Sequence, residues 1–110
     1  MSEYIVVFCT VPNLQTAEKI ADLVVPGRLA ACVNIVSGLV SVYTWKNELC
    51  RDQESLLIIK TRGALFNRLR EAILSVHPYE VPEIISLPIR DGHPDYLQWI
   101  TSSTIEPNQL

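Results

Sequence analysis

Residues 77–84 read His77-Pro78-Tyr79-Glu80-Val81-Pro82-Glu83-Ile84, and they separate a run with helical periodicity from a short apolar run. Two prolines four residues apart exclude a helix here, because each fixes its own φ and removes a backbone donor. Each also pushes the residue before it toward extended geometry. We therefore expect a stiff connector that displays an imidazole, a phenol and two carboxylates. It is either a rigid turn between a helix and a strand or part of a functional site.

The apolar patterns on either side of this connector predict alternating strands and helices. Residues 4–10 are apolar, aromatic or β-branched throughout, which is typical of a central strand covered on both faces. In chain order we expect a strand at 4–10, a helix at 14–24, a strand at 30–36 that resumes at 39–45, a strand at 55–61, a helix at 65–76, a strand at 84–89 and a helix at 95–103. Ser37-Gly38 indicates a bulge, and residues 46–48 indicate the turn of a long hairpin.

The element order βαββαβ with an added C-terminal helix predicts an α+β chain with the ferredoxin-like, split βαβ arrangement. One mostly antiparallel sheet would carry both crossover helices on one face. We expect a single domain over residues 1–110, since that length is near the common domain size. The opposite sheet face and the edges would lack cover although the strands are strongly apolar. Because exposed apolar edges aggregate unless they are paired, we expect self-association to cover them.

Composition narrows the class of protein. The net charge is −3 and the basic residues are scattered, so nucleic acid and anionic membranes are poor partners. No apolar run approaches the ~18 residues of a membrane span, and no basic region of a signal peptide is visible at the start. Cys9, Cys32 and Cys50 are an odd number without paired spacing. They indicate free thiols in a reducing compartment, most simply the cytoplasm.

Catalytic signatures are absent from the sequence. It has no G-x-S-x-G, H-E-x-x-H or C-x-x-C motif and no glycine-rich phosphate loop. Cys9 and His77 would act as nucleophile and base only if they met in space. Cys9 ends a buried strand, where cysteine is usually an inert hydrophobe. We therefore expect no enzyme, no catalytic residues and no organic cofactor.

A metal site is a better use of the same pair. Thiolate plus imidazole is a soft ligand set that suits copper, or less specifically zinc. Cys9 lies at the C-terminal end of the first strand and His77 at the end of the second helix, so the two can approach each other. Two ligands are too few for a closed site, so a third would come from another subunit, water or Glu80. The alternative is that His77 is a partly exposed residue at a helix end.

Aromatic residues offer a second candidate site. They either line a cleft or form the core and a subunit interface, where aromatics are enriched; they are Tyr43, Trp45, Tyr79, Tyr96 and Trp99. Lys60 closes a strand beside Arg62 and would suit an anion, unless it is an ordinary solvated strand-end charge.

Several segments together resemble one family, the CutA divalent-cation tolerance proteins, in order and spacing. They are Leu29-Ala30-Ala31-Cys32-Val33-Asn34-Ile35, Ser41-Val42-Tyr43-Thr44-Trp45, Lys60-Thr61, the connector from His77 to Glu83, and Tyr96-Leu97-Gln98-Trp99-Ile100. The resemblance covers nearly the whole chain. It implies a ferredoxin-like fold assembled as a homotrimer, similar in architecture to PII-type signalling proteins. It also implies a cytoplasmic role in tolerance to copper and other divalent metal ions.

The resemblance implies copper ligands as well. The family's ligands fall on the cysteine of the first strand, here Cys9, and on a His-His pair of which only His77 is present, because Val76 replaces its neighbour. The alternative function that it implies is a PII-like interaction module. Such a module would bind a small ligand, namely an anion, or a partner protein in an intersubunit cleft near Trp45, Lys60, Tyr79, Glu80 and Glu83.

Overall fold

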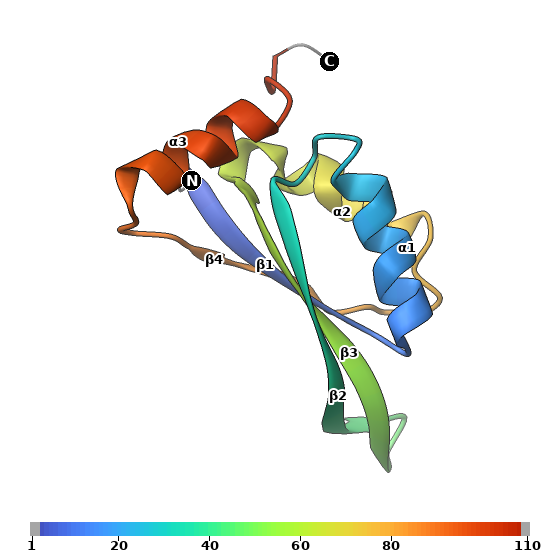
Figure 1. Ribbon diagram of the computed structural model, residues 1–110. Helices are drawn as coiled ribbons and strands as arrows, with labels where there is room; N and C mark the ends of the chain where they lie inside the picture. Colours follow the sequence, from blue (N-terminus) through green and yellow to red (C-terminus); the bar gives the residue numbers. More distant parts are fainter. Residues whose placement is uncertain (1–2, 109–110) are drawn as a thin grey trace.

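The alternating element order predicted from the sequence is confirmed in the computed structural model, which describes residues 3–108 (Figure 1). The elements are β1 (Tyr4–Val11), α1 (Leu14–Val24), β2 (Cys32–Trp45), β3 (Glu48–Arg62), the 3-10 turn η1 (Gly63–Leu65), α2 (Phe66–Leu74), β4 (Ile84–Pro88) and α3 (Pro94–Ser103). The four strands form one antiparallel sheet in the order β2-β3-β1-β4. This is the predicted ferredoxin-like arrangement with an added C-terminal helix.

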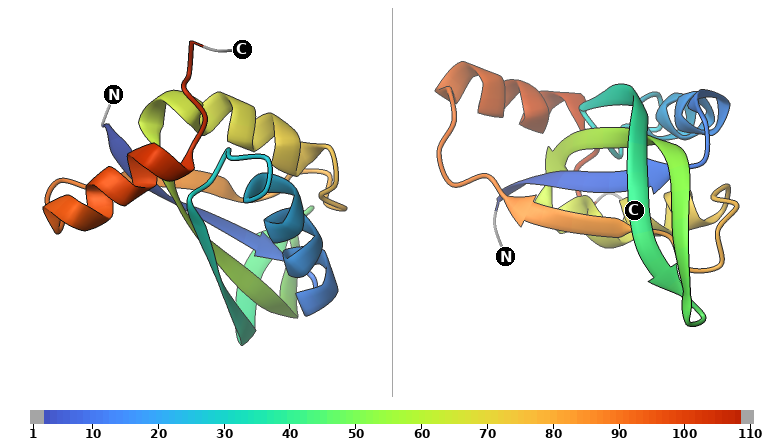
Figure 2. Two further views of the ribbon diagram at one scale, coloured as in Figure 1. Left: turned by 45° about the horizontal axis from the view of Figure 1, so that its top comes forward. Right: turned by 90° about the horizontal axis from the view of Figure 1, so that it is seen from below.

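Helices α1 and α2 cover one face of this sheet (Figure 2). Alternate residues of β1 point toward them and are buried, namely Ile5, Val7, Cys9 and Val11. They join Ile20 and Val24 of α1 and Leu69 and Ile73 of α2 in one apolar core. The residues between them on β1 stay partly exposed. The prediction that β1 is covered on both faces is therefore wrong for the single chain, because among residues 3–108 the second face of the strand is only partly covered.

Strands β2 and β3 form a long ribbon that extends beyond the rest of the molecule, at the bottom of Figure 1. The predicted bulge is present, since the register shifts between Val36 and Leu39 and Gly38 has φ +80°. Lys46 and Asn47 form the turn with φ of 51° and 67°. Positive φ at both central residues is the mark of the tight hairpin turn whose twist matches the strands.

The predicted start of the strand at residue 55 is wrong, because β3 begins at Glu48. Residues 48–54 are mostly polar, and their composition does not favour a strand. They are strand because β2 supplies a complete ladder of partners down to the Trp45–Glu48 pair. The other ends differ from the prediction by smaller amounts: β2 begins at Cys32, and α2 ends at Leu74.

The C-terminal part of the chain is tied to the N-terminal end of β1. The Tyr4 hydroxyl lies 2.5 Å from the Thr101 hydroxyl on α3. The Arg62 guanidinium donates to Thr104 Oγ1 at 2.9 Å, and Thr104 is itself buried. None of the helices formed by residues 3–108 has the length and apolar character that crossing a bilayer requires.

Candidate functional site

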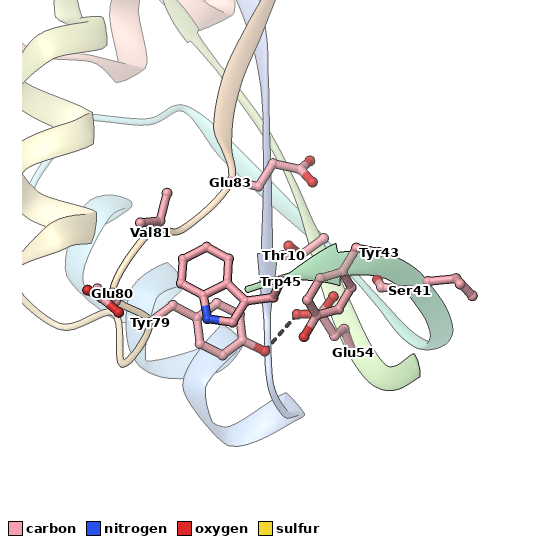
Figure 3. Close-up of a pocket in the computed structure, with 10 residues that line it drawn as sticks. Thr10, Ser41, Tyr43, Trp45, Glu54, Tyr79, Glu80, Val81 and Glu83 are labelled. Atoms are coloured by element: carbon pink, nitrogen blue, oxygen red, sulfur yellow. Dashed lines mark hydrogen bonds between the residues drawn. The ribbon is translucent and has the colours of Figure 1, made fainter. Parts of the chain in front are cut away.

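A cleft of about 550 Å³ lies between the connector that follows α2 and the β2–β3 ribbon (Figure 3). Its volume is within the range usual for small-ligand pockets. β2 contributes four residues, β1 and β3 one each, and the connector four. The lining is Thr10, Ser41, Val42, Tyr43, Trp45, Glu54, Tyr79, Glu80, Val81 and Glu83. The two prolines of the connector hold its four residues in an extended path, so this wall is stiff.

Tyr79 connects the two walls. Its hydroxyl donates to Glu54 Oε2 at 2.6 Å, and Figure 3 shows this bond crossing from the connector to the ribbon. Glu54 is only 8% exposed, so the carboxylate is largely removed from water. Burial, followed by the hydrogen bond to Glu54, raises the pKa of the Tyr79 phenol. The phenol therefore stays a donor at neutral pH and fixes one oxygen of the carboxylate.

His77 fixes the connector to β1. Its Nε2 lies 2.8 Å from the Thr10 carbonyl, and its Nδ1 accepts from the Tyr79 backbone N–H at 3.2 Å. Because a ring nitrogen that accepts from an N–H carries no proton, we assign the proton to Nε2, which donates to Thr10. The side chain is 9% exposed and its ring lies 4.9 Å from the Tyr79 ring, centroid to centroid. His77 is therefore a buried structural group and not a partly exposed helix end.

Cys9 lies one residue before the same carbonyl group. Its side chain is fully buried in the core, and its Sγ is 3.9 Å from Thr10 O. Burial, followed by the negative charges of Glu83 and Glu54, raises the pKa of the thiol to about 12. The prediction that Cys9 and His77 approach the same strand end is consistent with this geometry, since both contact the Thr10 carbonyl.

The charge of the cleft is one-sided. Three carboxylates line it, on Glu54, Glu80 and Glu83, whereas its lining contains no lysine, arginine or histidine. The Tyr43 hydroxyl, on the same wall, hydrogen-bonds Asp52, which raises the pKa of Tyr43 to about 12. A cleft with these walls attracts cations and repels anions, so the expectation of an anion beside Lys60 is wrong for this cleft.

Comparison with known proteins places the chain in a family. Residues 5–103 match the family model described as CutA1 divalent ion tolerance protein. The chain belongs to the CutA1 family. It is 50% identical over 99 residues to the divalent-cation tolerance protein CutA of Thermus thermophilus, which covers 90% of this chain and 96% of that protein. A chloroplastic CutA 1 of Oryza sativa is 48% identical over 102 residues, 93% of this chain but 58% of that longer protein.

Solved CutA1 structures share the fold. The structure from Thermus thermophilus superposes with a TM-score of 0.90 at 48% identity and covers 92% of this chain and 98% of that one. The structure from Oryza sativa gives a TM-score of 0.92 at 47% identity, with 96% of both chains covered. The ferredoxin-like fold of this CutA1 chain is thus the fold of its family.

The donor atoms of Cys9 and His77, as they lie in this CutA1 chain, do not fit a bound copper ion. A metal requires the thiolate, whereas burial holds the thiol protonated. It also requires a free imidazole nitrogen, and both nitrogens of His77 have backbone partners. Within residues 3–108, no three His, Cys, Asp or Glu side chains come together as a metal-binding group, and Glu80 therefore supplies no third ligand here.

Four of the five residues predicted to lie near an intersubunit cleft line the cleft of this chain. Trp45, Tyr79, Glu80 and Glu83 line the cleft, whereas Lys60 does not and instead contacts Asn34 Oδ1 on β2. Tyr43, one of the aromatic residues for which the sequence offered a cleft or an interface, lines the cleft as well. Sequence reasoning missed the other residues of the lining: Thr10, Ser41, Val42, Glu54 and Val81. The alternation that puts Ser41, Tyr43 and Trp45 on one strand face was the signal for Ser41. Glu54 gave no signal, because it lies before the strand predicted from the sequence.

Proposed function

We propose that this protein acts in the response to copper and other divalent metal ions as a cytoplasmic homotrimer. It binds metal ions and does not catalyse a reaction. Membership of the divalent-cation tolerance family supports the metal-related role. The observation that carries the assembled form is the open face of the sheet. The part of the proposal that concerns location is supported by three free cysteines, one of them buried and two partly exposed.

The sheet face opposite α1 and α2 is apolar and uncovered. Ile85 and Leu87 of β4 are 53% and 52% exposed, and they pair with Phe8 and Val6 of β1. Val36 of β2 is exposed as well. Monomeric proteins rarely expose contiguous apolar areas of this kind, and an uncovered sheet favours pairing with further copies. Assembly of three copies would bury this face, as the resemblance of the sequence implies.

Growth of the host organism tests the metal-related role directly. Deleting the gene should lower the concentrations of copper and zinc that stop growth, and a plasmid-borne copy should restore them. Magnesium at matched ionic strength serves as the control salt. A deletion strain that tolerates every divalent cation as well as its parent would overturn the proposed role.

Direct copper binding by Cys9 and His77 stays a prediction with its own test, and it would require the thiol to lose its proton and the imidazole to give up a backbone partner. Purified protein is titrated with Cu(I) and Cu(II) alongside Cys9→Ala and His77→Ala. If the pair holds copper, both variants bind it more weakly, and binding strengthens as pH rises because the thiol must lose its proton. Unchanged affinity in both variants would remove the assignment and leave the tolerance role to another mechanism.

A second candidate function is favoured by the cleft itself. We propose that it is the binding site of a PII-like interaction module for a small ligand or a partner. A volume of about 550 Å³ with convergent polar groups supports this role. Native mass spectrometry of the protein purified from its host tests it: a retained small molecule lost on denaturation is the expected result, and a bare polypeptide mass with no captured partner contradicts it.

A further inference from the structure

We propose that the cleft binds a small organic cation, through an alkylammonium or guanidinium group held between the Glu54 carboxylate and the Trp45 and Tyr79 rings. This inference deepens the second candidate function, on which it rests, and is independent of whether the chain binds metal. It concerns the chemistry of one cavity whose walls come from the ribbon and the connector (Figure 3).

Glu54 is a buried negative charge without a positive partner. No salt bridge to it forms among residues 3–108. The ion pairs in that part of the chain join Arg62 to Glu106, Arg90 to Asp91 and His93 to Asp95. Tyr79 occupies Oε2, and no group in that part of the chain hydrogen-bonds Oε1. No fully buried side-chain oxygen there lacks a partner, so Oε1 keeps some accessible surface, and Glu54 lines the cleft. A carboxylate that is largely removed from water and has no positive partner attracts a cation more strongly than an exposed carboxylate does, so a cation that enters the cleft gains more here than at the surface.

The rest of the cleft selects the kind of cation. Aromatic faces attract organic cations through their quadrupoles, and Trp45, Tyr43 and Tyr79 all line the cleft. Trp45 already shows this property, because the Lys46 ammonium lies 5.8 Å from its ring centroid. Val42 and Val81 add apolar contact for the carbon chain of a ligand. A small inorganic ion would gain little from such walls, and a hard divalent cation would seek several oxygen ligands at once.

The binding test uses the full-length protein and three probes at neutral pH: tetramethylammonium, butylammonium and butylguanidinium. Binding is followed through the backbone amide of Tyr79 and the indole N–H of Trp45 in ¹H–¹⁵N NMR spectra. We expect saturable shifts at both groups with a Kd of about 1 mM or tighter. 1-Butanol, which has the same chain without the charge, should bind at least about tenfold more weakly.

Two matched variants localise the effect. Glu54→Gln keeps the shape of the side chain and an acceptor for Tyr79, and it should weaken butylammonium binding at least about tenfold. Glu48→Gln removes an exposed carboxylate from the same strand outside the cleft, and it should leave binding unchanged. If Glu54→Gln does not fold, as the spectrum itself reveals, Glu83→Gln replaces it and should give the same direction.

Three results would overturn the inference: equal binding of 1-butanol, an unchanged affinity in the carboxylate variants, or shifts that map away from the cleft. A cleft filled by a lysine or arginine of a second copy would show no probe binding and would overturn it too. Failure of the wider module function is recognised separately, because native mass spectrometry would then find neither an organic cation nor any other ligand or partner.

Discussion

At the scale of single residues, His77 joins three parts of the site. Its Nε2–H donates to the Thr10 carbonyl of β1, and its Nδ1 accepts from the backbone N–H of Tyr79. The Tyr79 hydroxyl in turn donates to Glu54 on β3. A side chain that satisfies two backbone groups at a buried position contributes more than its own contacts, because its removal leaves both groups without partners. The position of Tyr79 in the cleft therefore depends on an imidazole that does not line it.

Replacing His77 by phenylalanine should lower the free energy of unfolding by about 2 kcal/mol, since two hydrogen bonds are lost while the ring volume is kept. His93→Phe is the matched control, because His93 is exposed and has only a 3.8 Å surface contact with Asp95. Urea unfolding at one protein concentration measures both. Equal losses in the two variants would show that the ring hydrogen bonds of His77 do not carry the effect.

The Cys9 thiol should be chemically silent in the folded protein. A pKa raised from 9.0 to about 12 leaves about 1000-fold less thiolate at pH 8 than an ordinary cysteine has, before burial slows access further. The measurement is the rate of alkylation by iodoacetamide in a Cys32→Ser, Cys50→Ser variant, with the denatured protein as control. The rate should still be rising at pH 10, where an ordinary thiol levels off. Alkylation at the rate of a free thiol would contradict the assigned burial.

The sequence predicted where the site lies better than it predicted which residues line it. The two prolines were enough to place Tyr79, Glu80 and Glu83 on a stiff wall. The opposing wall was predicted only in part. Glu54 looks like an ordinary polar residue until β3 is known to include it and to bring it next to Tyr79. Lys60 was grouped with the cleft because strand position alone does not reveal how far along the ribbon a side chain lies.

At the scale of elements, the β2–β3 ribbon depends on its turn. Lys46 and Asn47 both have positive φ, and lysine in particular is seldom found there. Local preference therefore opposes the turn at one residue and tolerates it at the next. The ladder of pairs that runs from Leu39 to the turn must supply the difference.

Asn47→Gly should stabilise the protein by about 0.5 kcal/mol, because glycine adopts positive φ without the steric cost that any L side chain carries. Gln53→Gly, in the middle of β3, should instead destabilise it by about 1 kcal/mol. Thermal unfolding of the two variants beside the parent protein provides the comparison. A loss of stability in both would show that the turn residues do not limit the ribbon.

Element types followed from periodicity, whereas one strand end did not. The helices at 14–24 and 95–103 were visible because each has a polar or proline start and an apolar stripe. The polar half of β3 could not be recognised, since its strand conformation comes from hydrogen bonds with β2 and not from its own composition. The proposal that both faces of β1 are covered failed for the single chain, although its apolar pattern is what an assembled sheet would require.

At the scale of the whole molecule, the open face of the sheet should decide the oligomeric state. Leu87→Asp places a charge on that face, on the edge strand β4 beside Val6, and should dissociate the assembly. The control, Leu23→Asp, alters an exposed leucine on α1 on the helical side of the molecule. Sedimentation equilibrium should give about three times 12.4 kDa for the parent and the control, and 12.4 kDa for Leu87→Asp.

A parent protein that sediments as a folded monomer at micromolar concentration would contradict the homotrimer. The cleft argument would survive such a result, because all ten lining residues belong to one chain. The metal-related role would survive as well, since it rests on family membership.

One wall of the cleft belongs to a ribbon that projects past the layer of helices, while the other belongs to the body of the chain. A second subunit that packs against the ribbon would therefore affect the distance between the two walls of the cleft. Occupancy of the cleft and the stability of the oligomer are then thermodynamically linked, so a ligand that binds the assembled form more tightly than the single chain would slow the exchange of subunits between oligomers. The measurement mixes isotopically light and heavy oligomers and follows the formation of mixed oligomers by native mass spectrometry. The coupling would appear as a change in the half-time of subunit exchange when the ligand is added.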